Sequence, residues 1–494
     1  MKKQAFNPYL PLYAYIPDGE PHLFGDRVYI YGSCDKEGGE TFCMGDYTVY
    51  SAPVDDLADW RQEGVIYRAE QDPDYGERKY MYAPDVVQGN DGRYYLYYCM
   101  SGSFGFGGYY GPISVAVCDT PAGKYEYLGF VKYPDGTPMK KYVCFDPCAF
   151  NDNGTIRIYY GTQFQNETND VLAADEAKLK EVMQRFGKTA EEILATEDNV
   201  NGACMAVLED DMLTVKGEPC HIIPYEADFG GHEFFEASSM RKVGDKYYFV
   251  YSSQKNHELC YAVSDRPDGG FAYGGTIVSN GDVGLNGRTD EERLNMTGTT
   301  HGSIIEINGE WYVFYHRLTH KSDYSRQGCA ERIEIAPDGS IKQVEVTSCG
   351  LNGGALIGKG SYPAAIACNI TNGHMPHGSN KIYTDSFPNV NHAVRADGEV
   401  ERFIAEISSG TLIGYKYFSF EGAKSITLTV RGKGSGRVSV RTAADGDEVA
   451  SVNISAADDW TEFSAPLSIA DGVFPIYLVF DIDGETALRD ISFE

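Results

Sequence analysis

The stretch SSMRKVGDKYYFVYSS, residues 238–253, shows the pattern that decides the fold. A short apolar strand runs into a turn with Gly and Asp, and an alternating aromatic strand follows, which is typical of a β-hairpin. The same pattern returns four more times, about 60–90 residues apart. The other copies are HLFGDRVYIYGS (22–33), DVVQGNDGRYYLYYCMS (85–101), CAFNDNGTIRIYYGT (148–162) and SIIEINGEWYVFYHR (303–317). The repeat therefore organises most of the first two thirds of the chain.

Further strand pairs lie between the copies. Examples are ISVAVCDTPAGKYEYLG (113–129) and LCYAVSDRPDGGFAYGG (259–275). Five units, each made of two hairpins, predict a five-bladed β-propeller, because a β-sandwich would not repeat at this spacing. We therefore expect an all-β protein whose residues 1–345 form a propeller.

One segment departs from the repeat. Residues 166–198 place Leu172, Leu179, Val182 and Phe186 at helical spacing. We expect a helical insertion in the region of the third blade. It is either surface decoration or a lid over a pocket.

The pattern changes again near residue 345. Residues 350–362, GLNGGALIGKGSY, are rich in Gly and resemble a linker. The strands that follow, such as KSITLTVRG, GRVSVRTA and PIYLVFDI, alternate without the hairpin repeat. This predicts an antiparallel β-sandwich over residues 360–494.

The overall charge narrows the range of partners. The net charge is −30 and the sequence pI is about 4.7. Such a surface repels phosphate backbones, so we expect no nucleic-acid partner. No stretch approaches 18 consecutive apolar residues, so no membrane partner is expected either.

The cysteines and the first residues of the sequence indicate the cellular compartment of the protein. Twelve cysteines are scattered without a CxxC pair, which indicates buried free thiols in a reducing compartment. The start, MKKQAFNPYLPLYAYIPDGE, lacks the long apolar run of a signal peptide. We expect a cytoplasmic protein, with secretion as the alternative if an export signal has been removed.

Acidic side chains lie near the start of the first strand of the repeats. In a propeller these strands surround the axis, so their ends converge on one pocket. Two carboxyl groups on either side of a sugar bond are the working parts of a glycosidase. A glutamate behind two Phe residues, as in HEFFEASS, is suited to hold its proton. The candidates are Asp18 and Glu20, Asp85, Asp146, and Glu236, while the fifth copy offers His301.

With these motifs in this order, the chain resembles glycoside hydrolase family 43 over about residues 6–345. The segment NPYLPLYAYIPDGEP is similar to the family's N-terminal motif, which implies Asp18 as the general base, with Glu20 as the alternative. YAPDV is similar to the second motif and implies Asp85 as the group that tunes and orients the acid. FFEASS is similar to the third and implies Glu236 as the general acid.

The resemblance also implies residues around the reacting groups. His301 in TGTTHGS would lie on the axis near a calcium ion or its waters, although the chemistry itself needs no cofactor. Tyr82, which stands where the family usually has Trp, is expected to contact the sugar together with Phe104, Phe235 and Arg317. The C-terminal part resembles a family 6 carbohydrate-binding module, which would either bind sugar or brace the propeller.

The expected activity is inverting hydrolysis that releases α-L-arabinofuranose or β-D-xylose from oligosaccharides derived from plant polysaccharides. Asp18 would deprotonate the water and Glu236 would protonate the leaving oxygen. Two alternatives remain open. The same fold could act on a β-galactofuranoside or cleave arabinan internally, or the propeller could bind sugar without catalysis.

Overall fold

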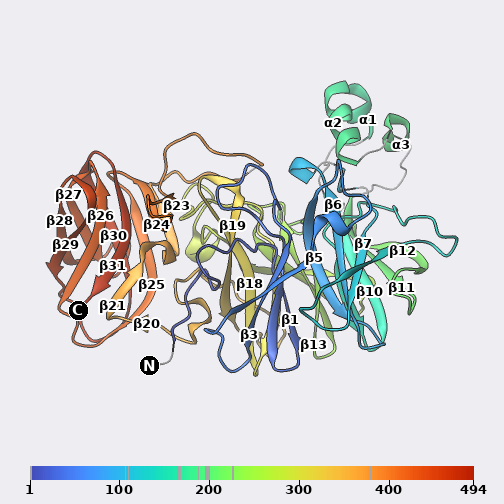
Figure 1. Cartoon of the computed structure of the whole chain (residues 1–494), viewed down its shortest axis with the longest axis horizontal. Helices are drawn as coiled ribbons and strands as arrows, with labels where there is room; N and C mark the ends of the chain where they lie inside the picture. Colours follow the sequence, from blue (N-terminus) through green and yellow to red (C-terminus); the bar gives the residue numbers. More distant parts are fainter. Residues whose placement is uncertain are drawn as a thin grey trace.

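The computed structural model describes residues 3–105, 107–109, 111–163, 169–186, 189–194, 201–224, 227–378 and 380–494. Five small sheets surround a common axis, and two larger sheets form a second body at the C-terminal end (Figure 1). The protein is therefore an all-β propeller followed by a β-sandwich, as the repeat predicts. The strands divide between the two bodies at about residue 350.

The five sheets of the propeller are antiparallel meanders. The first contains β1 (Glu20–Phe24), β2 (Arg27–Tyr31), β3 (Tyr47–Pro53) and β4 (Arg61–Tyr67). The second contains β5 (Tyr80–Gln88), β6 (Tyr94–Ser101), β7 (Ser114–Cys118) and β8 (Glu126–Phe130). The third contains β9 (Cys148–Asp152), β10 (Thr155–Thr162), β11 (Gly202–Leu208) and β12 (Val215–Pro224). The fourth contains β13 (Phe234–Val243), β14 (Lys246–Ser253), β15 (Leu259–Ser264) and β16 (Ala272–Val278), and the fifth contains β17 (Ser303–Ile307), β18 (Glu310–Thr319) and β19 (Ser322–Ile333).

Each repeated hairpin turns on a glycine. The turn between the first two strands of every sheet holds a glycine with φ between 58° and 92°, a left-handed backbone that side chains rarely adopt. These residues are Gly25, Gly92, Gly154, Gly244 and Gly309. The first strands then contact one another around the axis, and β1 meets β17 to close the ring.

The fifth sheet has three strands among the described residues, not the four that the repeat predicts. The N-terminal segment lies along the edge of β19 instead. The amide of Tyr9 donates to the carbonyl of Gly328 (3.1 Å), and the side chain of Asn7 exchanges two hydrogen bonds with the backbone of Ala330 (3.0 Å each). The first blade and the last blade are therefore joined through the N-terminal segment as well as through β1.

The predicted helical insertion is present between β10 and β11, within the third sheet. It contains α1 (Asn169–Ala174), α2 (Glu176–Phe186) and α3 (Ala190–Leu194). Leu172, Val182 and Ile193 are buried in the same apolar cluster as the second and third blades. Figure 1 shows these helices projecting beyond the blades at one end.

The sandwich consists of two packed six-stranded sheets. One contains β20 (Leu356–Ile357), β22 (Asn369–Thr371), β25 (Leu412–Phe420), β27 (Ser435–Arg441), β28 (Glu448–Ile454) and β30 (Gly472–Asp483). The other contains β21 (Gly360–Pro363), β23 (Asn389–Val394), β24 (Val400–Ile407), β26 (Ser425–Gly432), β29 (Ala457–Pro466) and β31 (Thr486–Phe493). Their inward-facing side chains, such as Leu428, Val440 and Leu478, form one buried core.

Charged and polar contacts tie the sandwich to the propeller. The ammonium of Lys416 on β25 bonds to Asp282 (3.0 Å) and Glu345 (2.9 Å) of the propeller. Arg317 on β18 donates to the carbonyls of Ala365 (2.6 Å) and Ala367 (2.8 Å). The two bodies therefore share a buried, partly ionic junction.

Short 3₁₀ segments punctuate the connections. They are η1 (Ala69–Gln71), η2 (Ser103–Gly105), η3 (Leu285–Gly287), η4 (Gly350–Asn352) and η5 (Ala364–Ile366). Over the described part of the chain, the helices are too short or too polar to cross a bilayer.

Candidate active site

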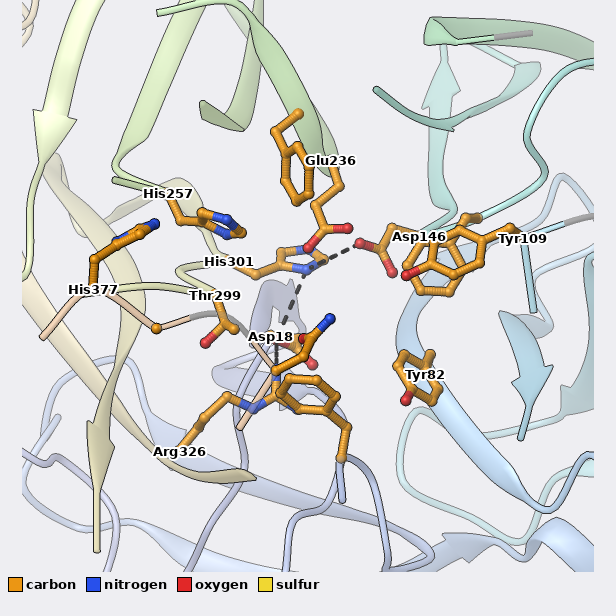
Figure 2. Close-up of a pocket in the computed structure, with 15 residues that line it drawn as sticks. Asp18, Tyr82, Tyr109, Asp146, Glu236, His257, Thr299, His301, Arg326 and His377 are labelled. Atoms are coloured by element: carbon orange, nitrogen blue, oxygen red, sulfur yellow. Dashed lines mark hydrogen bonds and ion pairs between the residues drawn. The ribbon is translucent and has the colours of Figure 1, made fainter. Parts of the chain in front are cut away.

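A cavity of about 170 Å³ opens where the first strands of the five sheets begin (Figure 2). Three acids line it: Asp18 just before β1, Asp146 just before β9, and Glu236 near the start of β13. His301, just before β17, lies among them. Acids that are far apart in the sequence therefore meet in one hollow.

Asp18 is buried and held by positive and polar partners. Arg326 donates to its Oδ1 (2.7 Å), and the Asp18 amide donates to Nδ1 of the buried His316 (3.2 Å). Burial raises the pKa of Asp18, but the charge of Arg326, assisted by His301 and His316, outweighs burial and brings the pKa below its ordinary value. Asp18 is thus an ionised carboxylate at neutral pH.

Glu236 is directed into the cavity by an irregular strand. The pairing of β13 with β14 shifts register on both sides of Glu236, and Ala237 has a left-handed φ of 69°. Such a bulge re-aims a side chain at the edge of a sheet. The neighbouring Phe235 also lines the cavity, so the predicted setting of an acid beside an aromatic ring is present.

Asp146 lies beside Glu236 and His301. Its Oδ2 is 3.8 Å from Nδ1 of His301, whose Nδ1 is also 3.9 Å from Oδ1 of Asp18. Burial, followed by the negative charges of Glu236 and Asp18, raises the pKa of Asp146 well above its ordinary value. Asp18 and Asp146 therefore have opposite electrostatic surroundings within one cavity.

The structure corrects the expected position of Asp85. This residue is not among the described residues that line the cavity. Its carboxylate accepts from the amides of Val86 (2.7 Å) and Ala149 (2.8 Å) and lies 2.6 Å from Nε2 of His22. The carboxylate is thus bound by its own strand and by the neighbouring strands β1 and β9, because Asp85 lies within β5 and not before it.

Glu20, the alternative base, belongs to the same axial network as Asp85. Its Oε2 accepts from Arg241 (2.7 Å) and from Ser239 (3.1 Å), and Ser239 is 2.7 Å from Ser303. The network joins the first strands of all five blades, and no described contact brings Glu20 into the cavity. Between the two candidates for the base, the cavity contains Asp18 alone.

The groups around His301 do not suit a directly bound calcium ion. Calcium takes six to eight oxygen ligands, whereas this site offers an imidazole, two carboxylates and the competing cation Arg326. Burial lowers the pKa of His301 to about 4, so the ring is neutral at ordinary pH.

The predicted sugar contacts separate into three groups. Tyr82 and Phe235 line the cavity. The side chain of Phe104 lies outside the described part of the structure. Arg317 instead binds carbonyls at the junction with the sandwich, so the cationic residue of the cavity is Arg326, nine residues further along.

Several residues of the cavity were not identified from the sequence. Phe42, Tyr109 and Phe145 add aromatic walls, and the rings of Tyr109 and Phe145 are 4.3 Å apart. Asp146 was already a candidate acid, because CFDPC places it just before a repeat, as Asp18 is placed, but the resemblance gave it no role. The loop aromatics had no recognisable signal in the sequence, since their positions depend on how neighbouring blades pack.

One wall of the cavity comes from beyond the propeller. His377, Gly378 and Asn380 lie in the connection between β22 and β23 of the sandwich. The Gly378 amide donates to the carbonyl of Thr297, and Nδ1 of His377 is 3.1 Å from Oγ1 of Thr297. The cavity is therefore completed by the second body.

Comparison with known proteins identifies the architecture. The family model described as glycosyl hydrolases family 43 matches residues 22–201 and 186–341. The chain belongs to glycosyl hydrolase family 43. The closed ring of five blades is accordingly that of a glycoside hydrolase, and the substrate is a carbohydrate.

Relatives match over the whole chain as well as over the propeller. A protein named xylosidase/arabinosidase from Thermoclostridium stercorarium is 43% identical over 511 residues, with 100% of this chain and 99% of the relative covered. Xylosidase/arabinosidase 43A from Humicola insolens is 32% identical and covers 66% of this chain and 96% of its own. Among solved structures, the GH43_1 enzyme from Xanthomonas citri complexed with xylose is 26% identical with a TM-score of 0.52, covering 69% of this chain and 93% of that one.

Proposed function

We propose that this family 43 protein is an exo-acting, inverting glycosidase that releases α-L-arabinofuranose or β-D-xylose from short oligosaccharides. The observation that carries the proposal is the meeting of Asp18, Asp146 and Glu236 in one cavity. The names of the relatives support the two sugars. A cavity of about 170 Å³ is below the ~300 Å³ typical of sites for larger ligands, so it suits a single sugar unit.

In the proposed mechanism Asp18 is the general base. Arg326 keeps the carboxylate ionised and fixed, and His316 holds the Asp18 backbone amide, so the carboxylate can take a proton from the attacking water. Inversion requires the base and the acid on opposite sides of the anomeric carbon, with room for that water between them. Asp18 comes from the first blade and Glu236 from the fourth, which is consistent with opposed approaches.

Glu236 is the general acid, and Asp146 takes the modulating role that the motif resemblance gave to Asp85. The negative charges of Glu236 and Asp146 oppose each other, so this pair retains a proton that isolated carboxyl groups would lose. That proton is delivered through Glu236 to the leaving oxygen. The reaction uses side-chain acids and bases and needs no cofactor.

A panel of substrates tests this proposal. Rates on the nitrophenyl derivatives of α-L-arabinofuranose, β-D-xylose and β-D-galactofuranose are measured side by side, together with linear arabinan. We expect turnover on the first two and, by NMR of the first product formed, an inverted anomeric centre. A preference for the galactofuranoside would show that the proposed sugars are wrong. Internal cleavage of arabinan would show that the enzyme is endo-acting and not exo-acting. Binding without turnover of any substrate would refute catalysis.

We also propose a reducing, cytoplasmic location. None of the twelve cysteines forms a disulfide bond, and eight of them are buried. Imported oligosaccharides would then be the natural substrates. Fractionation of the native host decides the question, because activity in the secreted fraction contradicts it.

A further inference from the structure

Three side chains of metal-binding types, one glutamate and two histidines, meet at the junction of the first blade, the last blade and the sandwich. Glu37 lies between β2 and β3, His320 lies in the turn between β18 and β19, and His392 lies on β23. Nε2 of His320 is 2.9 Å from Nδ1 of His392, and Oε1 of Glu37 is 3.8 Å and 3.6 Å from these two nitrogens. This group is separate from the cavity that holds Asp18 and Glu236.

The backbone at His320 is held in an unusual conformation. His320 and Lys321 have φ values of 57° and 51°, in a two-residue turn that normally uses Asn and Gly. Left-handed residues other than Gly are strained and tend to occur where function needs them. The amide of His320 donates to the carbonyl of Val390 (2.9 Å), which brings the turn against β23.

The hydrogen bonds determine which nitrogen of His320 carries the proton. The hydroxyl of Thr319 donates to the carbonyl of Ser325 (2.9 Å) and lies 2.9 Å from Nδ1 of His320. Because a hydroxyl has a single hydrogen, Nδ1 of His320 must be the donor in the second contact. Nε2 of His320 therefore directs a lone pair toward His392 and Glu37, as a metal ligand does.

The carboxylate of Glu37 is also fixed from outside the cluster. Tyr15 donates to its Oε1 (2.9 Å), and Arg402 donates to its Oε2 (2.9 Å). Ligating carboxylates and imidazoles are typically supported by such outer hydrogen bonds. Arg402 binds the oxygen that does not face the two histidines, so its charge neutralises the carboxylate without occupying the space between the rings.

We propose that Glu37, His320 and His392 bind one Zn²⁺ ion. Ligands 2.0–2.1 Å from a tetrahedral zinc ion lie ~3.3 Å from each other, and the observed separations of 2.9–3.8 Å bracket this value. Two imidazoles with one carboxylate suit zinc, whereas calcium and magnesium prefer oxygen ligands alone. The side chain of His392 is 26% exposed, which leaves one side open for a water as fourth ligand.

The ion would brace the wall of the active site. β23 directly follows the connection that carries His377, Gly378 and Asn380 into the cavity. Cross-linking β23 to the first and last blades fixes one end of that connection. This role is structural and is independent of which sugar the enzyme accepts.

Zinc titration of the full-length, tag-free protein tests the proposal. The protein is stripped with a chelator and titrated with zinc chloride in a calorimeter at neutral pH. We expect one ion per chain, and at least about tenfold weaker binding in His392→Gln and in Glu37→Gln. Zinc should raise the melting temperature of the wild type in a concentration-dependent way, with little effect on either variant.

Two controls make the result specific. His374→Ala removes an exposed histidine from the same connection and should bind zinc like the wild type. Substitution with Co²⁺ should give a visible absorption band without a thiolate charge-transfer band, which excludes the cysteines as ligands. The proposal is overturned if the wild type binds no zinc, or if both Gln variants bind it as tightly as the wild type.

Discussion

At the scale of single residues, Asp18 and Asp146 show how one cavity creates two different carboxyl groups. Both are buried, but Asp18 contacts the guanidinium of Arg326, whereas Asp146 faces the negative charges of Glu236 and Asp18. The first is therefore prepared to accept a proton and the second to keep one near Glu236. Opposed environments of this kind move the pKa values of two carboxyl groups apart, so that one can act as a base and the other can keep a proton.

The pH dependence should report the link between Arg326 and Asp18. When the positive charge of the guanidinium is moved away from Asp18, burial becomes the main influence on this carboxyl group. The pKa of Asp18 therefore rises. Because the base must be ionised, we expect Arg326→Lys to move the acid limb of kcat/KM to higher pH, since Lys cannot bond Asp18 and Asp35 in the same fork geometry. A pH profile with the limb unmoved would contradict the assignment of Asp18.

The role of Glu236 should depend on the leaving group. A nitrophenolate leaves without protonation, whereas a sugar alkoxide does not. Glu236→Gln should lose about 10²–10⁴-fold in kcat on a xylooligosaccharide and much less on a nitrophenyl glycoside. Equal losses on the two substrates would argue against general-acid catalysis by this residue.

At the scale of elements, the connection between β22 and β23 is a tightly fitted part of the cavity. A Cβ at Gly378 would lie 2.3 Å from Oδ1 of Asp323 and 3.0 Å from the carbonyl oxygen of Thr297. Alanine therefore cannot enter without moving the connection. We expect Gly378→Ala to lower kcat/KM by about tenfold or more, in line with the sensitivity of active sites to ~1 Å displacements.

The control for this prediction is His374→Ala, which alters an exposed side chain of the same connection and should leave kcat/KM unchanged. If Gly378→Ala keeps full activity while the protein stays folded, the sandwich contributes no functional wall to the cavity.

The sequence predicted the elements better than their meeting points. Five hairpins were recognisable because their turn glycines and aromatic strands repeat, and Gly154 and Gly244 adopt the left-handed backbone that such turns need. The three-stranded fifth sheet was not predictable, because the N-terminal segment reaches β19 from more than 300 residues away. The cavity wall at His377 was not predictable either, since it comes from the sandwich and not from the propeller.

The motif resemblance pointed to Asp85, whereas the cavity contains Asp146, and this difference has a similar cause. Both precede or begin an apolar run and both adjoin a proline. What separates them is their place along the strand: Asp146 stands before β9 with a left-handed φ of 46°, while Asp85 is in the middle of β5. A shift of a few residues along a first strand decides between the cavity and the axial network.

At the scale of the whole molecule, the axial network holds the ring of blades together. Asp85 bonds to His22 of β1 and to the amide of Ala149 in β9, and Arg241 of β13 bonds to Glu20 and to the carbonyl of Ile304 in β17 (3.0 Å). No disulfide bond closes the ring, so these non-covalent contacts hold the blades together where they converge. They explain why so many charged groups are buried on the axis.

Asp85→Asn should therefore be a stability variant. Asparagine removes the charge of a buried carboxylate and leaves some of its hydrogen-bond partners unsatisfied, which typically costs about 1–3 kcal/mol or more. We expect a clearly lower melting temperature for Asp85→Asn. Asp119→Asn, which removes an exposed pair with Arg93, should change the free energy of unfolding by less than about 1 kcal/mol.

The assignment of Asp146, and not Asp85, to the working acids is tested most directly by comparing the activities of Asp146→Asn and Asp85→Asn. Both are assayed on one oligosaccharide substrate, at a temperature where circular dichroism shows each variant folded. We predict a loss of about 10²-fold or more in kcat/KM for Asp146→Asn and a value near that of the wild type for Asp85→Asn. The reverse pattern, with Asp85→Asn inactive and Asp146→Asn active, would contradict the assignment of the working acids.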